Sequence, residues 1–271
     1  MEYRRENAAA IPGRAPQAVP LPDGDSLSAE DYGRLVRVVE SVDHVVDLLE
    51  FRQRFADALR NWFGLLGVSV LHGESLQAAL ETGCGIQSGY SARFLAGYRE
   101  RWQPFDPLRA ESTMARLLDA GVLRLSDVAA GSRFHTEYLA PHGITDKVVM
   151  VIDAGPAGVL FLSIAIRDAP AATEREVAVL RSLRRLLTPL VVGLLGRYQA
   201  QQALRTAWNL TPREWEIAHL AAQGMTNQQI ADRLFIGVHT VKKHLTRVLS
   251  EAACANRTQL ALHYNALEAA R

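Results

Sequence analysis

The sequence predicts an α+β protein in which an N-terminal α/β/α sandwich is followed by an all-α domain of four helices. Two strongly apolar segments, 147–153 and 158–167, flank the turn residues 154–157, which is typical of an antiparallel strand pair. Segments with helical spacing of apolar residues lie before and after this pair. The last sixty or so residues contain four helical segments in succession, so we expect a separate helical domain there.

The composition is that of a soluble protein large enough for two domains. The chain has 271 residues, of which 48% are hydrophobic and 22% charged, and its formal net charge is +1. Residues 1–26 are first charged and then rich in Ala, Pro and Gly, without the apolar core of a signal peptide, so we expect a disordered tail. We place the sandwich domain at 27–200 and the helical domain at 201–271.

Neither a membrane span nor a metal or disulfide framework is predicted. The longest lipophilic stretch, 148–166, is interrupted by Asp, Pro and two Gly residues. Cys84 and Cys254 lie far apart and near no other soft ligand, which fits a reducing cytosol. Cys84, close to two glycines, is either a redox sensor or, more simply, a small buried filler. We therefore expect a cytoplasmic protein with no metal and no cofactor.

The sandwich domain is expected to begin with helical structure over 28–63, because apolar residues recur there at spacings of three and four. Short strands are predicted around 68–70 and at 79–82, followed by a helix over 88–102 that ends before two prolines.

A long helix is expected after the strand pair, because Thr173 and Glu176 form a capping box. Pro189 falls inside this helix and predicts a kink or a fresh start. The helix carries a leucine stripe that we expect to cover the sheet and that is also a candidate surface for self-association: Leu180, Leu183, Leu187, Leu190 and Leu194.

Capping motifs in the sequence indicate where the first two C-terminal helices begin. Thr211 with Glu214, and Thr226 with Gln229, have the spacing of capping boxes. A turn at 235–237 precedes a third helix, which we place at 238–251.

The third helix has two different faces. Val241 and Leu245 form its apolar back, and no acidic residue occurs between Gly237 and Ser250. The outward positions are basic or able to form hydrogen bonds: His239, Lys242, Lys243, Thr246 and Arg247. Such a face suits the major groove of DNA, where Lys and Arg reach guanine edges and phosphates. The alternative is a four-helix domain without a DNA-binding role, in which these charged side chains only face solvent.

Four segments, in order and without gaps, resemble the LuxR/FixJ (GerE-type) helix-turn-helix family. They are Leu210-Thr211-Pro212-Arg213-Glu214, Ala222-Gln223-Gly224-Met225-Thr226-Asn227-Gln228-Gln229-Ile230-Ala231, Thr240-Val241-Lys242-Lys243-His244-Leu245 and Asn256-Arg257-Thr258-Gln259-Leu260. The resemblance implies a bacterial-type transcription regulator with a recognition helix at 238–251. It also implies base contacts from Lys242, Lys243 and Thr246, and backbone contacts from Thr226, Asn227, Thr240 and His244.

The segment departs from the family pattern at two places. Gly237 stands where the family usually has a Ser N-cap, at an expected cost of a few tenths of a kcal/mol. Residues 251–255 replace the usual Lys-Leu-Gly turn, where some members dimerise. This departure favours dimerisation through the N-terminal domain and its long helix.

In this family the N-terminal domain sets the activating signal. A phosphoacceptor receiver would open with a strand ending in paired acids, whereas this chain opens with a helix, so a phosphorelay receiver is not expected. Walker-type glycine loops are absent, which excludes the large ATP-binding members of the family.

An aromatic stripe, Tyr90, Phe94, Tyr98 and Trp102, recurs every four residues and is followed by Phe105, Asp106 and Pro107. The stripe is either core packing or the wall of an apolar ligand pocket with a few polar groups.

The stripe resembles the acyl-homoserine-lactone-binding domains of quorum-sensing LuxR proteins. That resemblance implies a pocket lined by Tyr90, Phe94, Tyr98, Trp102 and Phe105, with Asp106 accepting a hydrogen bond from the ligand amide. Phe94 replaces the usual Trp, and a second Trp after the Asp-Pro has no counterpart. A GAF-like or PAS-like sensor of another small molecule fits equally well.

Two histidines, His135 and His142, lie near Tyr138. They either point into the pocket or bind a metal, although a surface or helix-end role is the simpler interpretation.

We expect a DNA-binding regulator controlled by a small-molecule effector, with double-stranded DNA and a second copy of the chain as partners. RNA polymerase is a further candidate partner, and no membrane partner is expected. The alternative is a ligand-independent or protein-regulated factor whose N-terminal domain only dimerises or docks a partner. An enzyme is not expected, because no Gly-x-Ser-x-Gly, metal spacing or paired-acid motif is present.

Overall fold

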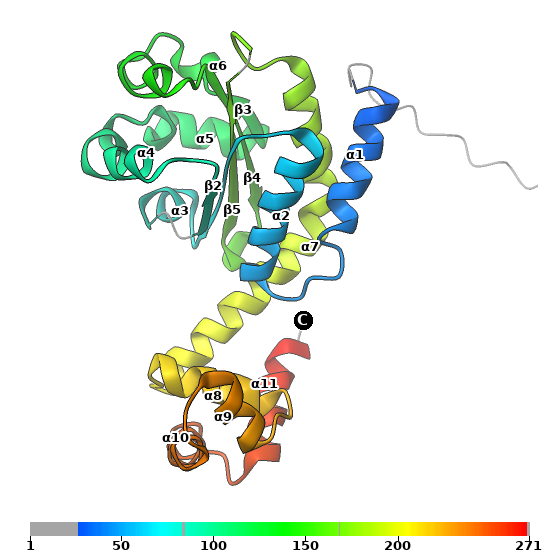
Figure 1. The fold of residues 1–271 in the computed structure, drawn as a ribbon, viewed down its shortest axis with the longest axis vertical. Helices are drawn as coiled ribbons and strands as arrows, with labels where there is room; N and C mark the ends of the chain where they lie inside the picture. The colour runs from blue at the N-terminus through cyan, green and yellow to red at the C-terminus, as the bar shows by residue number, and fades with distance from the viewer. Residues whose placement is uncertain (1–26, 83–84, 168, 270–271) are drawn as a thin grey trace, which may run out of the picture.

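The computed structural model describes residues 27–82, 85–167 and 169–269 (Figure 1). They form a mixed helix-and-sheet region followed by a group of four helices, which confirms the predicted fold class. The predicted disordered tail, 1–26, and Cys84 lie outside the described residues. In the described part of the chain, no helix is long and apolar enough to cross a membrane.

A five-stranded antiparallel sheet, ordered β2-β1-β5-β4-β3, forms the centre of the N-terminal region. The strands are β1 (Gly67–Gly73), β2 (Gly85–Ser88), β3 (Val122–Arg124), β4 (Asp146–Asp153) and β5 (Val159–Ile166). β4 and β5 are the predicted hairpin, and nearly every residue of both is buried. Burial on both faces explains why their sequences are apolar runs rather than alternating patterns.

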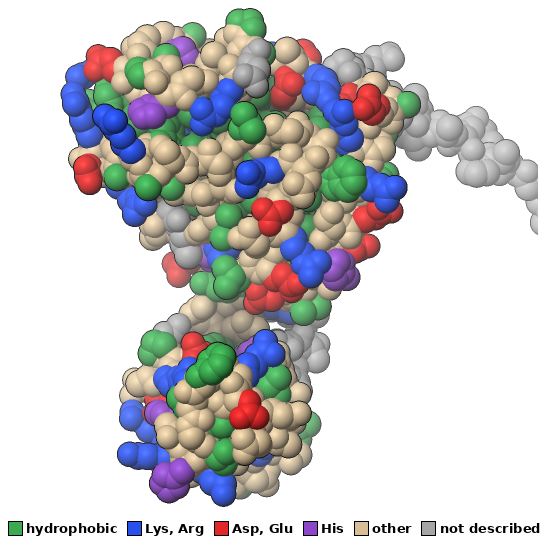
Figure 2. Space-filling model, viewed as in Figure 1, with side chains coloured by type: hydrophobic (Ala, Val, Ile, Leu, Met, Phe, Trp, Pro, Cys, Tyr) green, Lys and Arg blue, Asp and Glu red, His purple; other side chains and the backbone are tan. Residues whose placement is uncertain are grey.

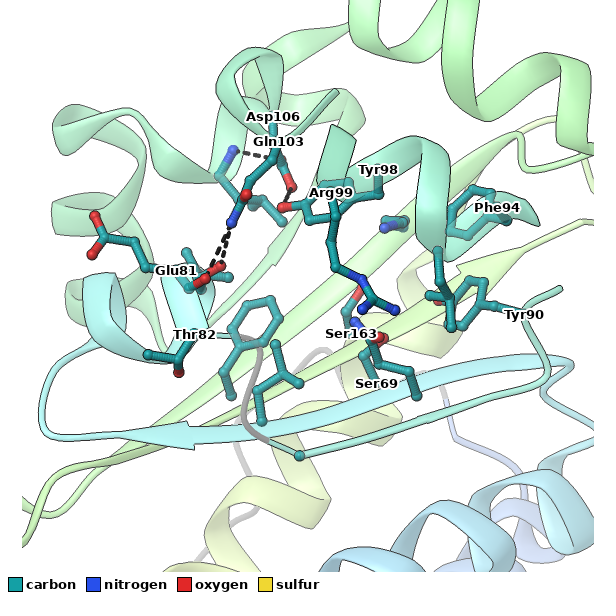
Figure 3. A pocket seen from close by; sticks show the side chains of 18 residues that line it. Ser69, Glu81, Thr82, Tyr90, Phe94, Tyr98, Arg99, Gln103, Asp106 and Ser163 are labelled. Atoms are coloured by element: carbon teal, nitrogen blue, oxygen red, sulfur yellow. Dashed lines mark hydrogen bonds between the residues drawn. The ribbon is translucent and has the colours of Figure 1, made fainter. Parts of the chain in front are cut away.

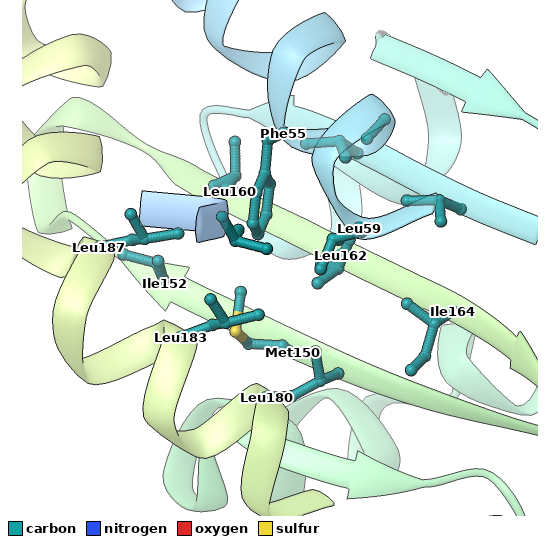
Figure 4. Close-up of a cluster of buried hydrophobic side chains, with 14 of the residues drawn as sticks. Phe55, Leu59, Met150, Ile152, Leu160, Leu162, Ile164, Leu180, Leu183 and Leu187 are labelled. Carbon is teal, nitrogen blue, oxygen red and sulfur yellow. The ribbon is translucent and has the colours of Figure 1, made fainter. Parts of the chain in front are cut away.

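Three long helices cover one face of the sheet: α1 (Ala29–Glu40), α2 (Leu48–Phe63) and α7 (Glu174–Ala207). In the cluster between them and the sheet, Phe55 and Leu59 of α2 and Leu183 of α7 face Met150 and Leu162 (Figure 4). These side chains are at most 2% exposed, so this layer is a continuous dry core.

Shorter elements cover the opposite face. The α-helices are α3 (Leu76–Thr82), α4 (Ala92–Gly97), α5 (Glu111–Ala120) and α6 (Ser126–Ala129). They alternate with π-helical turns at Tyr98–Trp102 (η1) and His135–Leu139 (η4). Single 3₁₀ turns are η2 (Gln103–Phe105), η3 (Pro107–Arg109), η5 (Ala140–His142) and η6 (Gly155–Ala157), the last of which joins β4 to β5. The two helical layers complete the predicted α/β/α sandwich.

Some local predictions are confirmed and others are wrong. The helical spacing predicted over 28–63 is confirmed, and the segment forms two helices, α1 and α2. Residues 79–82 end helix α3 and are not a strand, because Leu76, Ala79 and Leu80 follow helical spacing and are all buried. Of the two outcomes predicted at Pro189, a kink or a fresh start, the fresh start does not occur, since α7 is continuous through Pro189.

The start of α7 shows one half of the predicted capping box, and the Thr173 hydroxyl oxygen accepts a hydrogen bond from the Arg175 backbone N–H at 3.3 Å. The Thr173 backbone N–H and its hydroxyl both donate to the Glu176 carboxylate. Four leucines of the predicted stripe are buried and Leu190 is partly buried, so the stripe covers the sheet. The helix runs through the predicted domain boundary at 200/201 and leads to the four C-terminal helices (Figure 1).

The C-terminal helices are α8 (Pro212–Ala222), α9 (Asn227–Leu234), α10 (Val238–Glu251) and α11 (Arg257–Ala269). They enclose a hydrophobic cluster of their own, which includes Ile217, Ile230, Val241, Val248 and Leu260.

Candidate nucleic-acid interface and ligand cavity

The pair α9–α10 is built by local capping. The Thr226 hydroxyl accepts a hydrogen bond from the Gln229 backbone N–H at 3.2 Å, and the Gln229 side chain accepts one from the Thr226 N–H at 2.8 Å. Gly237 precedes α10 and provides no side-chain cap. The turn between the helices places Phe235 in the left-handed region, with φ 53° and a side chain that is 94% exposed.

α10 has the two faces that its sequence predicts. Val241, Leu245 and Val248 are buried against the domain core. The exposed residues include His239, Thr240, Lys242, Lys243, Thr246 and Arg247. Figure 2 shows Lys, Arg and His side chains gathered on the edge of the C-terminal lobe where α10 lies. α10 therefore presents a basic, hydrogen-bonding surface to solvent.

Glu214 of α8 lies behind this surface and holds two of its residues. Its Oε1 atom is 3.3 Å from Arg247 Nε and 3.7 Å from His244 Nδ1. Burial raises the pKa of the Glu214 carboxyl, but hydrogen bonds from Thr211 and the positive charge of Arg247 outweigh burial, so the net shift is downward. His244 and Arg247 are thus oriented by the protein itself.

Lys242 and Lys243 are exposed and form no ion pair within the described residues. Thr246 donates its hydroxyl hydrogen to the Lys242 carbonyl at 3.0 Å, which leaves the hydroxyl oxygen able to accept. Asn227 lies at the start of α9, where Arg257 NH1 is 3.5 Å from its Oδ1. Arg257 also donates to the carbonyls of Ala221 and Met225 and so fixes α11 to the α8–α9 connection.

A cavity of about 510 Å³ lies in the N-terminal region, on the sheet face opposite α7 (Figure 3). Its floor is formed by β1, β2, β4 and β5, and its other walls by α3, α4 and the turns that follow α4. Four of the predicted pocket residues line it: Tyr90, Phe94, Tyr98 and Asp106.

Asp106 is bound on both carboxylate oxygens. The Tyr98 hydroxyl donates to Oδ2 at 2.9 Å, as Figure 3 shows, and the Leu108 backbone N–H donates to Oδ1 at 3.0 Å. Burial, followed by the Asp106 charge, raises the pKa of Tyr98 well above its usual range, so Tyr98 remains a hydrogen-bond donor. Asp106 therefore has both predicted roles: it shapes the turn that the Asp-Pro sequence indicates, and it lines the cavity.

The aromatic stripe continues through a residue that is distant in sequence. The Phe94 ring stacks on those of Tyr90 and Tyr138, with 5.0 Å and 4.6 Å between ring centres, and the Trp102 ring stacks on that of Tyr138 with 5.6 Å between centres. Trp102 and Phe105 do not line the cavity, although both were expected there. The π-helical turn at Tyr98–Trp102 is the reason, because its wider winding rotates Trp102 off the four-residue repeat.

Sequence reasoning missed the polar floor of the cavity, which consists of Ser69, Lys147 and Ser163. Lys147 is only 9% exposed, and its Nζ atom lies 6.0 Å from the centre of the Tyr90 ring. Burial lowers the pKa of Lys147, while the Asp106 charge acts in the opposite direction. The sequence did contain a signal for this floor: Lys147 lies at the start of the apolar strand β4, and Ser163 lies within the apolar strand β5.

Histidines 135 and 142 have ordinary structural partners. A ring nitrogen of each lies 2.8 Å from a backbone carbonyl, that of Thr145 for His135 and that of Tyr138 for His142. Within the described ranges, no group of three or more side chains is arranged to hold a metal ion.

Residues 208–264 match the profile of the family described as bacterial regulatory proteins, luxR family. They form a LuxR-type helix-turn-helix domain. α8 to α10 and the start of α11 lie within this match, and α10 occupies the place predicted for the recognition helix. The resemblance predicted from the sequence is confirmed for this domain.

Curated relatives carry similar segments. The transcriptional regulatory protein LiaR of Bacillus subtilis is 37% identical over 121 residues, which are 44% of this chain and 55% of that protein. The DNA-binding transcriptional activator DevR/DosR of Mycobacterium tuberculosis is 30% identical over 138 residues, or 50% of this chain and 60% of that protein. The chain thus spans little more than half the length of these two relatives.

A crystal structure of Escherichia coli SdiA aligns with 88% of this chain and 98% of its own, at 17% sequence identity and a TM-score of 0.40. A TM-score this low supports no inference about the cavity or its ligand. The residue contacts of the LuxR-type domain with DNA, and the ligand contacts of the cavity, therefore stay predictions.

Proposed function

We propose that the chain is a regulator of transcription that binds specific double-stranded DNA sequences as a homodimer and responds to a small molecule in the cavity. The observation that carries the DNA-binding part is the exposed basic face of α10 in a LuxR-type domain. Lys242, Lys243 and Thr246 project from this face and are the proposed base contacts.

Phosphate contacts are proposed around the base-reading positions. Thr226, Asn227 and Thr240 lie at the first turns of α9 and α10, where backbone N–H groups favour phosphate oxygens. His239, His244 and Arg247 extend the positive side of α10. Phosphate contacts release counterions, so DNA affinity should fall steeply with added salt.

Small-molecule control is supported by the cavity. A regulator whose N-terminal region only dimerises or docks a protein would have a filled interior there. Instead, a space of about 510 Å³ is lined by both apolar and buried polar side chains, which is the usual character of a ligand site. The proposed ligand contacts are Tyr90, Phe94, Tyr98 and Asp106.

An acyl-homoserine lactone is one candidate signal. Asp106 would accept a hydrogen bond from its amide, and a carboxylate with about four lone-pair sites can do so while bound to Tyr98 and Leu108. This neutral ligand would leave Lys147 without a charged partner.

The homodimer is proposed from the geometry of DNA. Two half-sites one helical turn apart require a two-fold pair of recognition helices. Exposed apolar side chains on α1 and α7, namely Tyr32, Val36, Leu186 and Val192, offer a surface for such a contact in the N-terminal region.

The test combines three measurements on the full chain. Selection from a random DNA pool should yield one preferred, two-fold symmetric sequence, and light scattering should give the mass of a dimer. Native mass spectrometry should show a retained small molecule whose removal changes the affinity for the selected DNA. Absence of any sequence preference would overturn the DNA-binding proposal, and an unchanged affinity after removal would overturn ligand control.

A further inference from the structure

The polar floor of the cavity is placed by strand register. Ser69 of β1 is paired with Ser163 of β5, and Lys147 of β4 is paired with Ala165, two residues from Ser163. Side chains two residues apart on a strand point to the same face. The two hydroxyls and the ammonium group therefore project together into the cavity from three adjacent strands.

Two of these groups, Ser163 and Lys147, lack the partner that a buried polar group usually has. Ser163 Oγ has no hydrogen-bond partner within the described residues. Lys147 is more than nine-tenths buried and forms no ion pair there. A buried charge without a partner is costly, so a site that keeps one is poised to receive the opposite charge from a ligand.

The carboxylates of the cavity are already engaged. Asp106 accepts hydrogen bonds from Tyr98 and Leu108, and Glu81 lies 3.5 Å from Arg109. Arg99, an exposed side chain that also lines the cavity, adds a second positive charge at its edge (Figure 3). With Glu81 paired to Arg109, the charge of Asp106 stands against two cations of the lining, Lys147 and Arg99, so the balance is positive.

The apolar end of the cavity lies along the same strands. Phe161 and Leu71 are paired with each other; Leu71 follows Ser69 by two residues and Phe161 precedes Ser163 by two, a displacement of about 6–7 Å along the strands. Leu80 of α3 lines the same cavity. The cavity therefore has a cationic end at Lys147 and an apolar end at Phe161.

We propose that the cavity binds a small organic carboxylate with an apolar body, and that Lys147 pairs with its carboxylate group. The Ser163 and Tyr90 hydroxyls donate to the same carboxylate, and the apolar body lies against Leu71, Leu80 and Phe161. This inference rests on the proposed function of the cavity as a ligand site and names the chemical class of the ligand.

The test uses matched pairs of probes on the full-length protein: straight-chain carboxylates from butanoate to dodecanoate and ω-phenylalkanoates, each with its primary amide. Thermal unfolding identifies the binders, and calorimetry measures their Kd. At least one carboxylate should bind, and its amide should bind about 10–100-fold more weakly because the amide lacks the charge.

Variants locate the carboxylate. Lys147→Met keeps the length and apolar stem of the side chain, and should weaken carboxylate binding by about 10–100-fold without changing amide binding. Ser163→Ala, a smaller change in case Lys147→Met fails to fold, should weaken carboxylate binding by about threefold to tenfold. Arg93→Ala, an exposed change away from the cavity, should leave the Kd unchanged.

Amides that bind as tightly as their carboxylates, or Lys147→Met and Ser163→Ala that both retain full affinity, would overturn the inference. So would a panel in which no carboxylate binds. A neutral compound that is retained by the protein and controls its DNA affinity would overturn the carboxylate assignment but leave ligand control standing. Ligand control itself fails only if no bound small molecule changes DNA affinity.

Discussion

At the scale of single residues, two buried carboxylates hold separate helices together. Asp31 of α1 receives hydrogen bonds from Nε and NH2 of the Arg175 guanidinium of α7 and also caps α1 with Ser28. Glu214 of α8 closes the capping box with Thr211 and contacts Arg247 of α10. Both carboxylates are at most 4% exposed, so water cannot easily replace these partners.

Replacement of Glu214 by Ala should lower the free energy of unfolding by about 1.5–3 kcal/mol, because the Thr211 donors and Arg247 lose their acceptor. Urea unfolding at pH 7 measures this change. The matched control is Glu216→Ala, whose carboxylate is 53% exposed and pairs with Arg213, and whose loss should cost less than about 1 kcal/mol. Equal stability of the two variants would refute the anchoring role of Glu214.

The Asp31 pair should make stability depend on pH in the acid range. The hydrogen bonds from Arg175 lower the pKa of Asp31 from 3.8 to about 2. A lowered pKa in the folded state means that the ionised carboxylate stabilises the fold above pH 3.8, and that this stability is lost as the pH falls towards 2.

Asp31→Asn should therefore reduce the free energy of unfolding by about 1–2 kcal/mol near neutral pH, since Arg175 is partly exposed and screened. The difference from the unmodified protein should shrink between pH 4 and pH 2, as measured by urea unfolding. Asp119→Asn serves as the control, because Asp119 is exposed and is in no ion pair within the described residues. A difference that is constant down to pH 2 would contradict the assignment.

At the scale of elements, α10 begins without a side-chain cap. Gly237 has φ −71° and ψ 145°, which any residue can adopt, and a Cβ atom there would meet only Thr240 Oγ1 at 3.7 Å. Gly237→Ser should therefore stabilise the domain by a few tenths of a kcal/mol, because the new hydroxyl can accept from the first turn of α10. Gly237→Ala, which offers no acceptor, is the matched control in thermal unfolding. A Ser variant no more stable than the Ala variant would show that the cap does not form.

Elements with strong local signals were predictable from the sequence. The capping boxes that begin at Thr211 and Thr226 are each contained in four consecutive residues and mark the starts of α8 and α9. The hairpin of β4 and β5 is an apolar run on each side of a short turn. β3 has only three residues, and its existence depends on pairing with β4. A segment this short carries too little periodicity to be recognised.

The cavity was only partly predictable. The repeat of Tyr90, Phe94 and Tyr98 indicates one wall, and these three residues do line it. The π-helical turn that removes Trp102 is a matter of backbone winding, which spacing alone does not reveal. Lys147 and Ser163 meet Ser69 through strand register, a long-range property that no local pattern contains.

At the scale of the whole molecule, α7 connects the sheet-containing N-terminal region to the LuxR-type domain. Its first half covers the sheet face opposite the cavity, and Arg184 donates to the Val151 carbonyl of β4 at 2.8 Å. Its last residues lead to α8 and contact α11. β4 and β5 therefore lie between the proposed ligand site and α7.

The most direct test of the account is the equilibrium affinity of the full chain for its selected DNA site and for a scrambled site, measured by fluorescence anisotropy at one salt concentration. Lys242→Ala and Lys243→Ala should each weaken binding to the selected site by about 1–3 kcal/mol and reduce the preference over the scrambled site. Arg93→Ala, which removes an exposed charge from α4, should leave both affinities unchanged. Lysine variants that bind the selected site as tightly as the unmodified protein would contradict the assignment of α10 as the helix that reads DNA.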